Sequence, residues 1–207
     1  MTKKKKIVAG AVLLLALILL ASSFLLLRAG RRGSAQGVKL EAGAVFPPPE
    51  FTYYLQRDEA WAADSLGKSR YTMGSSGCLV SCIASLLSIY GEEVTPGELN
   101  DLFTEYGVYN DSGDVIWGNI AKVYPDIQVE VPGSVDSTAI EKQLEEQRYP
   151  LVRVKNLGDG YWHWVLLIGS DENGYLCMDP LYGEKTARPL AAHKDTVYSY
   201  RVIWLSH

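Results

Sequence analysis

The stretch MGSSGCLVSCIASLLSIYG, residues 73–91, decides the fold of this chain. From Cys78 onward it is apolar on nearly every face, so it predicts a helix over residues 78–90 at the centre of a buried core. Small and polar residues at 75–77 can cap the start of this helix, and Gly91 can end it. The helix would therefore carry a thiol at its amino terminus.

The rest of the domain divides into helices followed by strands. Thr95-Pro-Gly-Glu98 is a strong helix start, because a Thr cap, a Pro in the first turn and a Glu three positions on all favour it. β-branched and aromatic residues predict strands in the second half. We expect helices at 95–107, 115–123 and 137–148, and strands at 151–155, 162–169, 174–178 and 197–205. This order is typical of an α+β fold, with N-terminal helices packed on a C-terminal antiparallel sheet.

Three residues far apart in the sequence predict a catalytic site. Cys78 lies at a helix start, His163 on a strand, and Asp179 at the end of the next strand, after the turn at 171–174. The partial positive charge of a helix amino terminus favours a thiolate, and a neighbouring imidazole would favour it further. A carboxylate beside the imidazole would orient the ring. We therefore expect a Cys78–His163–Asp179 triad for amide hydrolysis or acyl transfer.

Several segments resemble the C39-like (papain-like) cysteine peptidase families over about residues 51–182. They are Gly77–Gly91, Tyr54-Leu-Gln-Arg-Asp58 with Trp61, Val94–Asn100 with Trp117-Gly118, His163–Gly169 and Met178-Asp-Pro180. The resemblance implies a papain-like fold with Cys78, His163 and Asp179 as the triad. Papain-like enzymes also use an oxyanion glutamine shortly before the cysteine. Thr72 stands at that spacing here, so Gln56 is the oxyanion candidate.

A second function class stays open from the sequence. Free cysteines are often small buried hydrophobes, and this is how we interpret Cys82 and Cys177. Many members of the resembled families have Gly-Pro directly after the cysteine, whereas this chain has Leu79-Val80. The alternative is therefore a catalytically inactive papain-like domain that binds a peptide or a cell-wall ligand.

The N-terminal part predicts a membrane anchor. Residues 1–6 are basic, and residues 7–27 are uncharged and, at 1.5 Å per residue, roughly 31 Å long as a helix, enough to cross a bilayer. Residues 28–49 lack core-forming content and predict a linker, followed by the peptidase-like domain at 50–207. We expect a single-pass protein of bacterial type with its C-terminal domain outside the cytoplasm, secreted if the anchor is cleaved.

Charge restricts the partners. Residues 1–32 hold seven of the 20 Lys and Arg and none of the 24 Asp and Glu, so the remainder has 13 basic and 24 acidic groups, a net of −11. Such a surface repels phosphate, which argues against nucleic acid. The three histidines show no metal-ligand spacing, and no cofactor is expected. The expected partners are a peptide or protein substrate, including a cell-wall peptide, and the membrane through the N-terminal helix.

Overall fold

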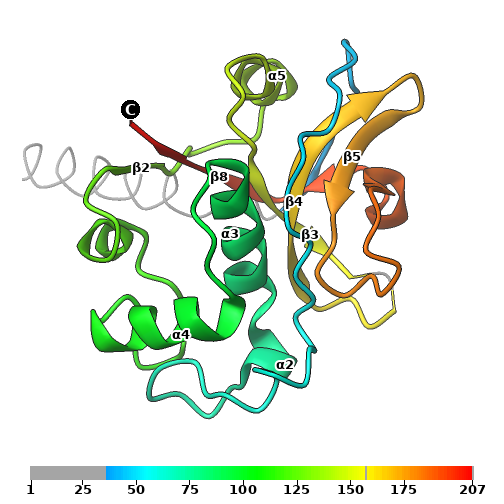
Figure 1. Cartoon of the computed structure of the whole chain (residues 1–207). Helices are drawn as coiled ribbons and strands as arrows, with labels where there is room; N and C mark the ends of the chain where they lie inside the picture. Colours follow the sequence, from blue (N-terminus) through cyan, green and yellow to red (C-terminus); the bar gives the residue numbers. More distant parts are fainter. Residues whose placement is uncertain (1–35, 157, 207) are drawn as a thin grey trace, which may run out of the picture.

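A computed structural model describes residues 36–156 and 158–206, which fold into helices and antiparallel strands. Figure 1 shows helix α3, Cys78–Ile89, running alongside the sheet. The predicted membrane segment at 7–27 lies outside the described residues. Within the described ranges, no helix is both long and apolar enough to cross a bilayer.

Helix α3 is the predicted central helix. Its first ten residues, Cys78–Leu87, are all buried, and α3 packs on β3, β4 and α4. The sequence analysis missed a short helix, α2 (Met73–Ser76), capped by Thr72. Gly77 alone separates α2 from α3, and a Cβ there would lie 2.6 Å from the carbonyl oxygen of Met73. Only glycine fits this junction, which sets where Cys78 begins α3.

The other helices agree with the sequence in place but differ in extent. Helix α4 has the predicted capping box, in which Thr95 and Glu98 bond each other's backbone amides. The helix expected at 115–123 is a shorter 3-10 helix, and the one expected to reach residue 148 ends earlier, just before Gln147 takes a positive φ of 56°. The bounds are α4 Pro96–Glu105, η1 Trp117–Lys122, α5 Ser137–Glu145 and η2 Leu190–His193.

The main sheet has six strands in the order β2-β8-β3-β4-β5-β6, and every pair is antiparallel. Three strands were predicted closely, and the last was predicted as one strand but is divided at Tyr198. The sequence analysis missed β2 and β6. The bounds are β2 Ile127–Glu130, β3 Leu151–Lys155, β4 Trp162–Asp171, β5 Gly174–Met178, β6 Arg188–Pro189, β7 Thr196–Val197 and β8 Ser199–Leu205.

The described part of the expected linker contacts the domain. Strand β1, Val38–Lys39, pairs with β7, and Leu40 is buried in the core. Further along, Phe46 forms an antiparallel bridge with Ser170 on β4. The packed structure therefore begins upstream of Glu50.

Candidate active site

Cys78 differs from the other two cysteines in its surroundings. It is the first residue of α3 and keeps 8% of its surface exposed, whereas Cys82 and Cys177 are fully buried. Burial raises the pKa of the Cys82 thiol well above its ordinary value, and it also raises that of Cys177. Those two thiols stay protonated and belong to the core, as their apolar neighbours in the sequence indicate.

His163 and Asp179 are brought together by the β4–β5 hairpin. His163 is the second residue of β4, and Asp179 directly follows β5. His163 Nε2 lies 2.7 Å from Asp179 Oδ1, and both side chains are almost completely buried. Cys78 lies close enough to His163 to influence the pKa of its imidazole. Because Asp179 occupies Nε2, Nδ1 is the ring nitrogen left for a further partner.

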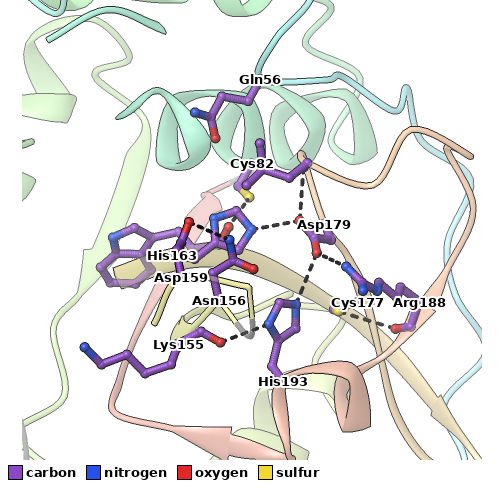
Figure 2. Close-up of polar contacts among 12 residues, drawn as sticks. Gln56, Cys82, Lys155, Asn156, Asp159, His163, Cys177, Asp179, Arg188 and His193 are labelled. Carbon is purple, nitrogen blue, oxygen red and sulfur yellow. Dashed lines mark hydrogen bonds and ion pairs between the residues drawn. The ribbon is translucent and has the colours of Figure 1, made fainter. Parts of the chain in front are cut away.

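Asp179 lies at the centre of a dense hydrogen-bond network (Figure 2). Its Oδ1 accepts from His163 and from the Leu181 amide, at 2.7 and 3.0 Å. Its Oδ2 lies 2.6 Å from Arg188 Nη1 and 3.1 Å from His193 Nε2. Burial would raise the pKa of Asp179, but the hydrogen bonds with His163 and then His193 hold it far below the ordinary range. The carboxylate is therefore ionised at any physiological pH.

The ionised Asp179 in turn favours the charged form of His163. Burial by itself would lower the pKa of His163. Hydrogen bonds with Asp179 and with Cys78 outweigh burial and raise this pKa from 6.5 to about 9. An imidazolium next to a thiol favours the thiolate.

The sequence analysis missed His193 and Arg188. His193 is 3% exposed at the end of η2, and its Nδ1 also contacts the Lys155 carbonyl oxygen at 3.2 Å. The two imidazole rings are 5.8 Å apart. Nothing in the local sequence marks either residue, because both reach Asp179 only through the path of the chain after β5.

The Tyr53–Gln56 segment runs beside the Asp179 turn. The Tyr53 hydroxyl donates to the Asp179 carbonyl oxygen at 2.6 Å and accepts from the Asp179 amide at 3.0 Å. The backbone amide of Gln56 donates to the Pro180 carbonyl oxygen at 2.9 Å. The Gln56 side chain is buried, and its Nε2 donates to Gly74 in α2, while its Oε1 has no hydrogen-bond partner. The candidate Gln56 thus lies between the acid and the helix turn before Cys78.

The described side chains around these residues do not form a metal-ligand cluster. In the part of the chain that the structure describes, no group of three or more His, Cys, Asp or Glu side chains is arranged to hold a metal ion. The polar atoms around Asp179 instead satisfy one another.

Comparison with known proteins places the fold. The structure resembles the crystal structure of a Bacillus anthracis protein provisionally named a C39-like peptidase, with a TM-score of 0.53 and 13% sequence identity. The match covers 79% of this chain and 98% of the other. No protein-family model matches the sequence, and no curated protein does. The mixed fold with antiparallel strands therefore resembles that of the provisionally named C39-like peptidase.

Proposed function

We propose that this chain is a cysteine peptidase or acyl transferase in which Cys78 is the nucleophile, His163 the proton carrier and Asp179 the residue that orients His163. The observation that carries the proposal is the buried 2.7 Å contact between His163 and Asp179, with the Cys78 side chain near enough to raise the pKa of the same imidazole. A buried, ionised carboxylate costs folding free energy unless it is paired. Here Asp179 is paired with His163 and fixes the orientation of its ring. Of the three cysteines, Cys78 alone keeps part of its surface exposed.

The reaction begins with the Cys78 thiolate attacking the carbonyl carbon of an amide. A C–S bond forms and the carbonyl electron pair moves to oxygen. The intermediate collapses when the C–N bond breaks, and the His163 imidazolium gives its proton to the departing amine. Water then attacks the thioester while neutral His163 accepts its proton. The C–S bond breaks, which releases the acid and restores the thiolate–imidazolium pair. An amine in place of water would give acyl transfer.

The developing oxyanion needs hydrogen-bond donors. Backbone amides in the first turn of α3 have no partner one turn earlier within that helix, and the amide of Cys78 is one of them. Gln56 Nε2 supplies a second donor in this proposal, because one of its two hydrogens bonds Gly74 and the other is left for substrate.

The second candidate is an inactive domain that binds a peptide or cell-wall ligand. One observation favours it: Gln56 Nε2 is already bonded to Gly74 at 3.0 Å, so the oxyanion donor is partly committed within the protein. In either case the partner is a peptide-like ligand. With the anchor at residues 7–27, we place this ligand outside the cytoplasm and next to the membrane.

Thiol reactivity separates the two candidates. In the full-length chain, iodoacetamide alkylation of each cysteine is followed by mass spectrometry between about pH 4 and 9. An active enzyme should show Cys78 alkylated already at about pH 5–6, and this early reaction should disappear in His163→Ala. Cys82 and Cys177 serve as internal controls, because burial keeps both protonated. If Cys78 is alkylated only at the pH of an ordinary thiol in both the parent protein and His163→Ala, the catalytic proposal is contradicted. The inactive peptide-binding domain is then the remaining candidate.

A further inference from the structure

A cavity of about 330 Å³ borders the helix turn that carries Cys78. Its lining includes Ser76 and Leu79, which lie on either side of Cys78 in the sequence. Across from them are Trp164, the residue after His163, and two arginines, Arg153 of β3 and Arg201 of β8. The lining of the cavity therefore includes sequence neighbours of both Cys78 and His163, together with two positively charged side chains.

Strand register places the arginines together. Arg153 is paired with Trp164 on β4 and with Ser199 on β8. Arg201 lies two residues beyond Ser199, so it shares the face of Arg153 and Trp164. The guanidinium of Arg201 lies 5.4 Å from the Trp117 ring and 5.9 Å from the Trp164 ring. The aromatic rings thus hold Arg201 in a fixed position at the cavity.

Neither arginine has an anionic partner within the part of the chain that the structure describes. Among the described residues, Arg153 and Arg201 form no ion pair, and the Nε of each is buried without a hydrogen-bond partner. The remaining residues contain no Asp or Glu. One carboxylate, Asp114, lines the cavity, but it accepts a hydrogen bond from Asn110 and lies beyond ion-pair distance of both arginines. Arg201 Nη1 donates to the neighbouring Tyr200 carbonyl oxygen.

The electrostatics of this pair are unfavourable without a ligand. Burial lowers the pKa of Arg153, and burial followed by repulsion from Arg153 lowers the pKa of Arg201. Two adjacent cations with buried, unbonded N–H groups are costly in a folded domain. A guanidinium presents parallel N–H donors that match a carboxylate, so a bound carboxylate would satisfy these donors and remove the repulsion.

We propose that this cavity binds a carboxylate of the peptide substrate close to the scissile bond, through Arg153 and Arg201. The proposal rests on the peptidase function above and names its substrate class, a peptide with an acidic group next to the cleaved amide. Trp117 and Trp164 form the apolar walls for the carbon atoms that carry the acid. The carboxylate belongs to an acidic side chain or to the free C-terminus of the peptide.

Peptide binding to the full-length Cys78→Ala variant tests the proposal without any reaction. Fluorescence anisotropy compares three peptide families of equal length: Glu-containing with an amidated C-terminus, Gln-containing with an amidated C-terminus, and Gln-containing with a free C-terminus. We expect one of the acidic families to bind roughly 10- to 100-fold more tightly than the neutral one, which is what charged hydrogen bonds contribute. The family that gains identifies the source of the carboxylate.

Arginine variants show where that preference arises. Arg153→Gln and Arg201→Gln, each in the Cys78→Ala chain, should remove the preference for acid. Arg148→Gln is the matched control, because Arg148 also stacks on a tryptophan, Trp204 at 4.2 Å, but does not line the cavity. The control should keep the preference. Using two separate arginines keeps the test valid if one variant fails to fold.

The outcomes separate this proposal from the proposed function. Equal binding of all three families, no binding by any, or an equal loss in Arg148→Gln would overturn the carboxylate site, whatever the alkylation experiment shows. An acid preference that depends on Arg153 and Arg201 supports the site even if Cys78 proves unreactive, in which case catalysis fails and the cavity belongs to a binding domain.

Discussion

Two charged centres lie on opposite sides of β4, and they differ in how the fold treats them. Alternation along the strand points His163 to one side and Trp164 to the other. On the first side, Asp179 receives bonds from His163, Arg188, His193 and a backbone amide. On the second, Arg153 and Arg201 form no ion pair with any carboxylate of the described residues. The fold supplies hydrogen-bond partners for the charge of Asp179, whereas the carboxylate partner of the two arginines is, in our proposal, the substrate.

Removing the nucleophile should give the largest effect. Cys78→Ala should lower amide hydrolysis by about 10³-fold or more, since the thiolate forms the covalent intermediate. Hydrolysis of a mixed peptide library, read by mass spectrometry, measures the change. Cys177→Ala is the matched control and should retain activity, because its thiol is fully buried and bonded to the Arg188 carbonyl oxygen. Comparable activity in Cys78→Ala and the parent protein would contradict the proposed nucleophile.

Breaking the hydrogen-bond network around Asp179 should strongly destabilise the fold. Asp179→Asn leaves Arg188, His163 and His193 without their shared carboxylate, and losing one partner of a buried ion pair costs about 3–5 kcal/mol in the free energy of unfolding. Urea unfolding followed by circular dichroism measures it. Asp171→Asn is the control, because an Asn side chain can still accept the Asn173 amide in the hairpin turn. A loss below about 1 kcal/mol for Asp179→Asn would show that the network is dispensable for folding.

The charge of His163 should set the alkaline limit of activity. Its pKa is about 9, so the imidazolium that protonates the leaving amine is lost as the pH rises through this value. The stability from the charged ring has the same sign: it is fully present below the unfolded value of 6.5 and disappears as the pH rises through about 9. We expect the rate to fall about tenfold per pH unit above that point. A pH–rate profile that stays flat to pH 10 would disagree.

Substitution in the Arg153–Arg201 pair should have the smallest effect on the free energy of unfolding. Without a ligand, Arg201→Gln removes no ion pair and relieves repulsion from Arg153, so the free energy of unfolding should stay within about 0.5 kcal/mol of the parent protein. Urea unfolding of the two proteins side by side measures this. A loss above about 2 kcal/mol would mean that Arg201 is structural and that the contrast with Asp179 does not hold.

Helices and strands with strong local signals could be predicted from the sequence. The capping box at Thr95 and the apolar run after Cys78 gave α4 and α3, because capping and burial patterns are encoded within one element. The shorter elements were missed or misplaced. Strand β2 exists because it pairs with β8, some 75 residues later, and no local pattern records such a partner.

The difference between local signals and distant contacts also explains the exposure of the two tryptophans beside His163. Alternation places Trp162 and Trp164 on the strand face opposite His163, and such a shared face is typical of residues that pack in the core. Trp162 is instead 48% exposed, with Lys155 Nζ 3.5 Å from its ring and Arg153 4.3 Å. Trp164 borders the arginine cavity. Alternation correctly assigned the shared face, but it could not tell which residues of the neighbouring strands would cover it.

The sequence by itself determined the residue types of the site and the elements that carry them: a thiol at a helix start, an imidazole on a strand and a carboxylate after the next strand. Only the tertiary structure decided their environment. It brought His193 and Arg188 to Asp179 and left Arg153 and Arg201 without a counterion among residues 36–156 and 158–206. The physical reason is that hydrogen-bond geometry and burial depend on residues that are distant in sequence, whereas helix caps and strand alternation depend on neighbours within a few positions.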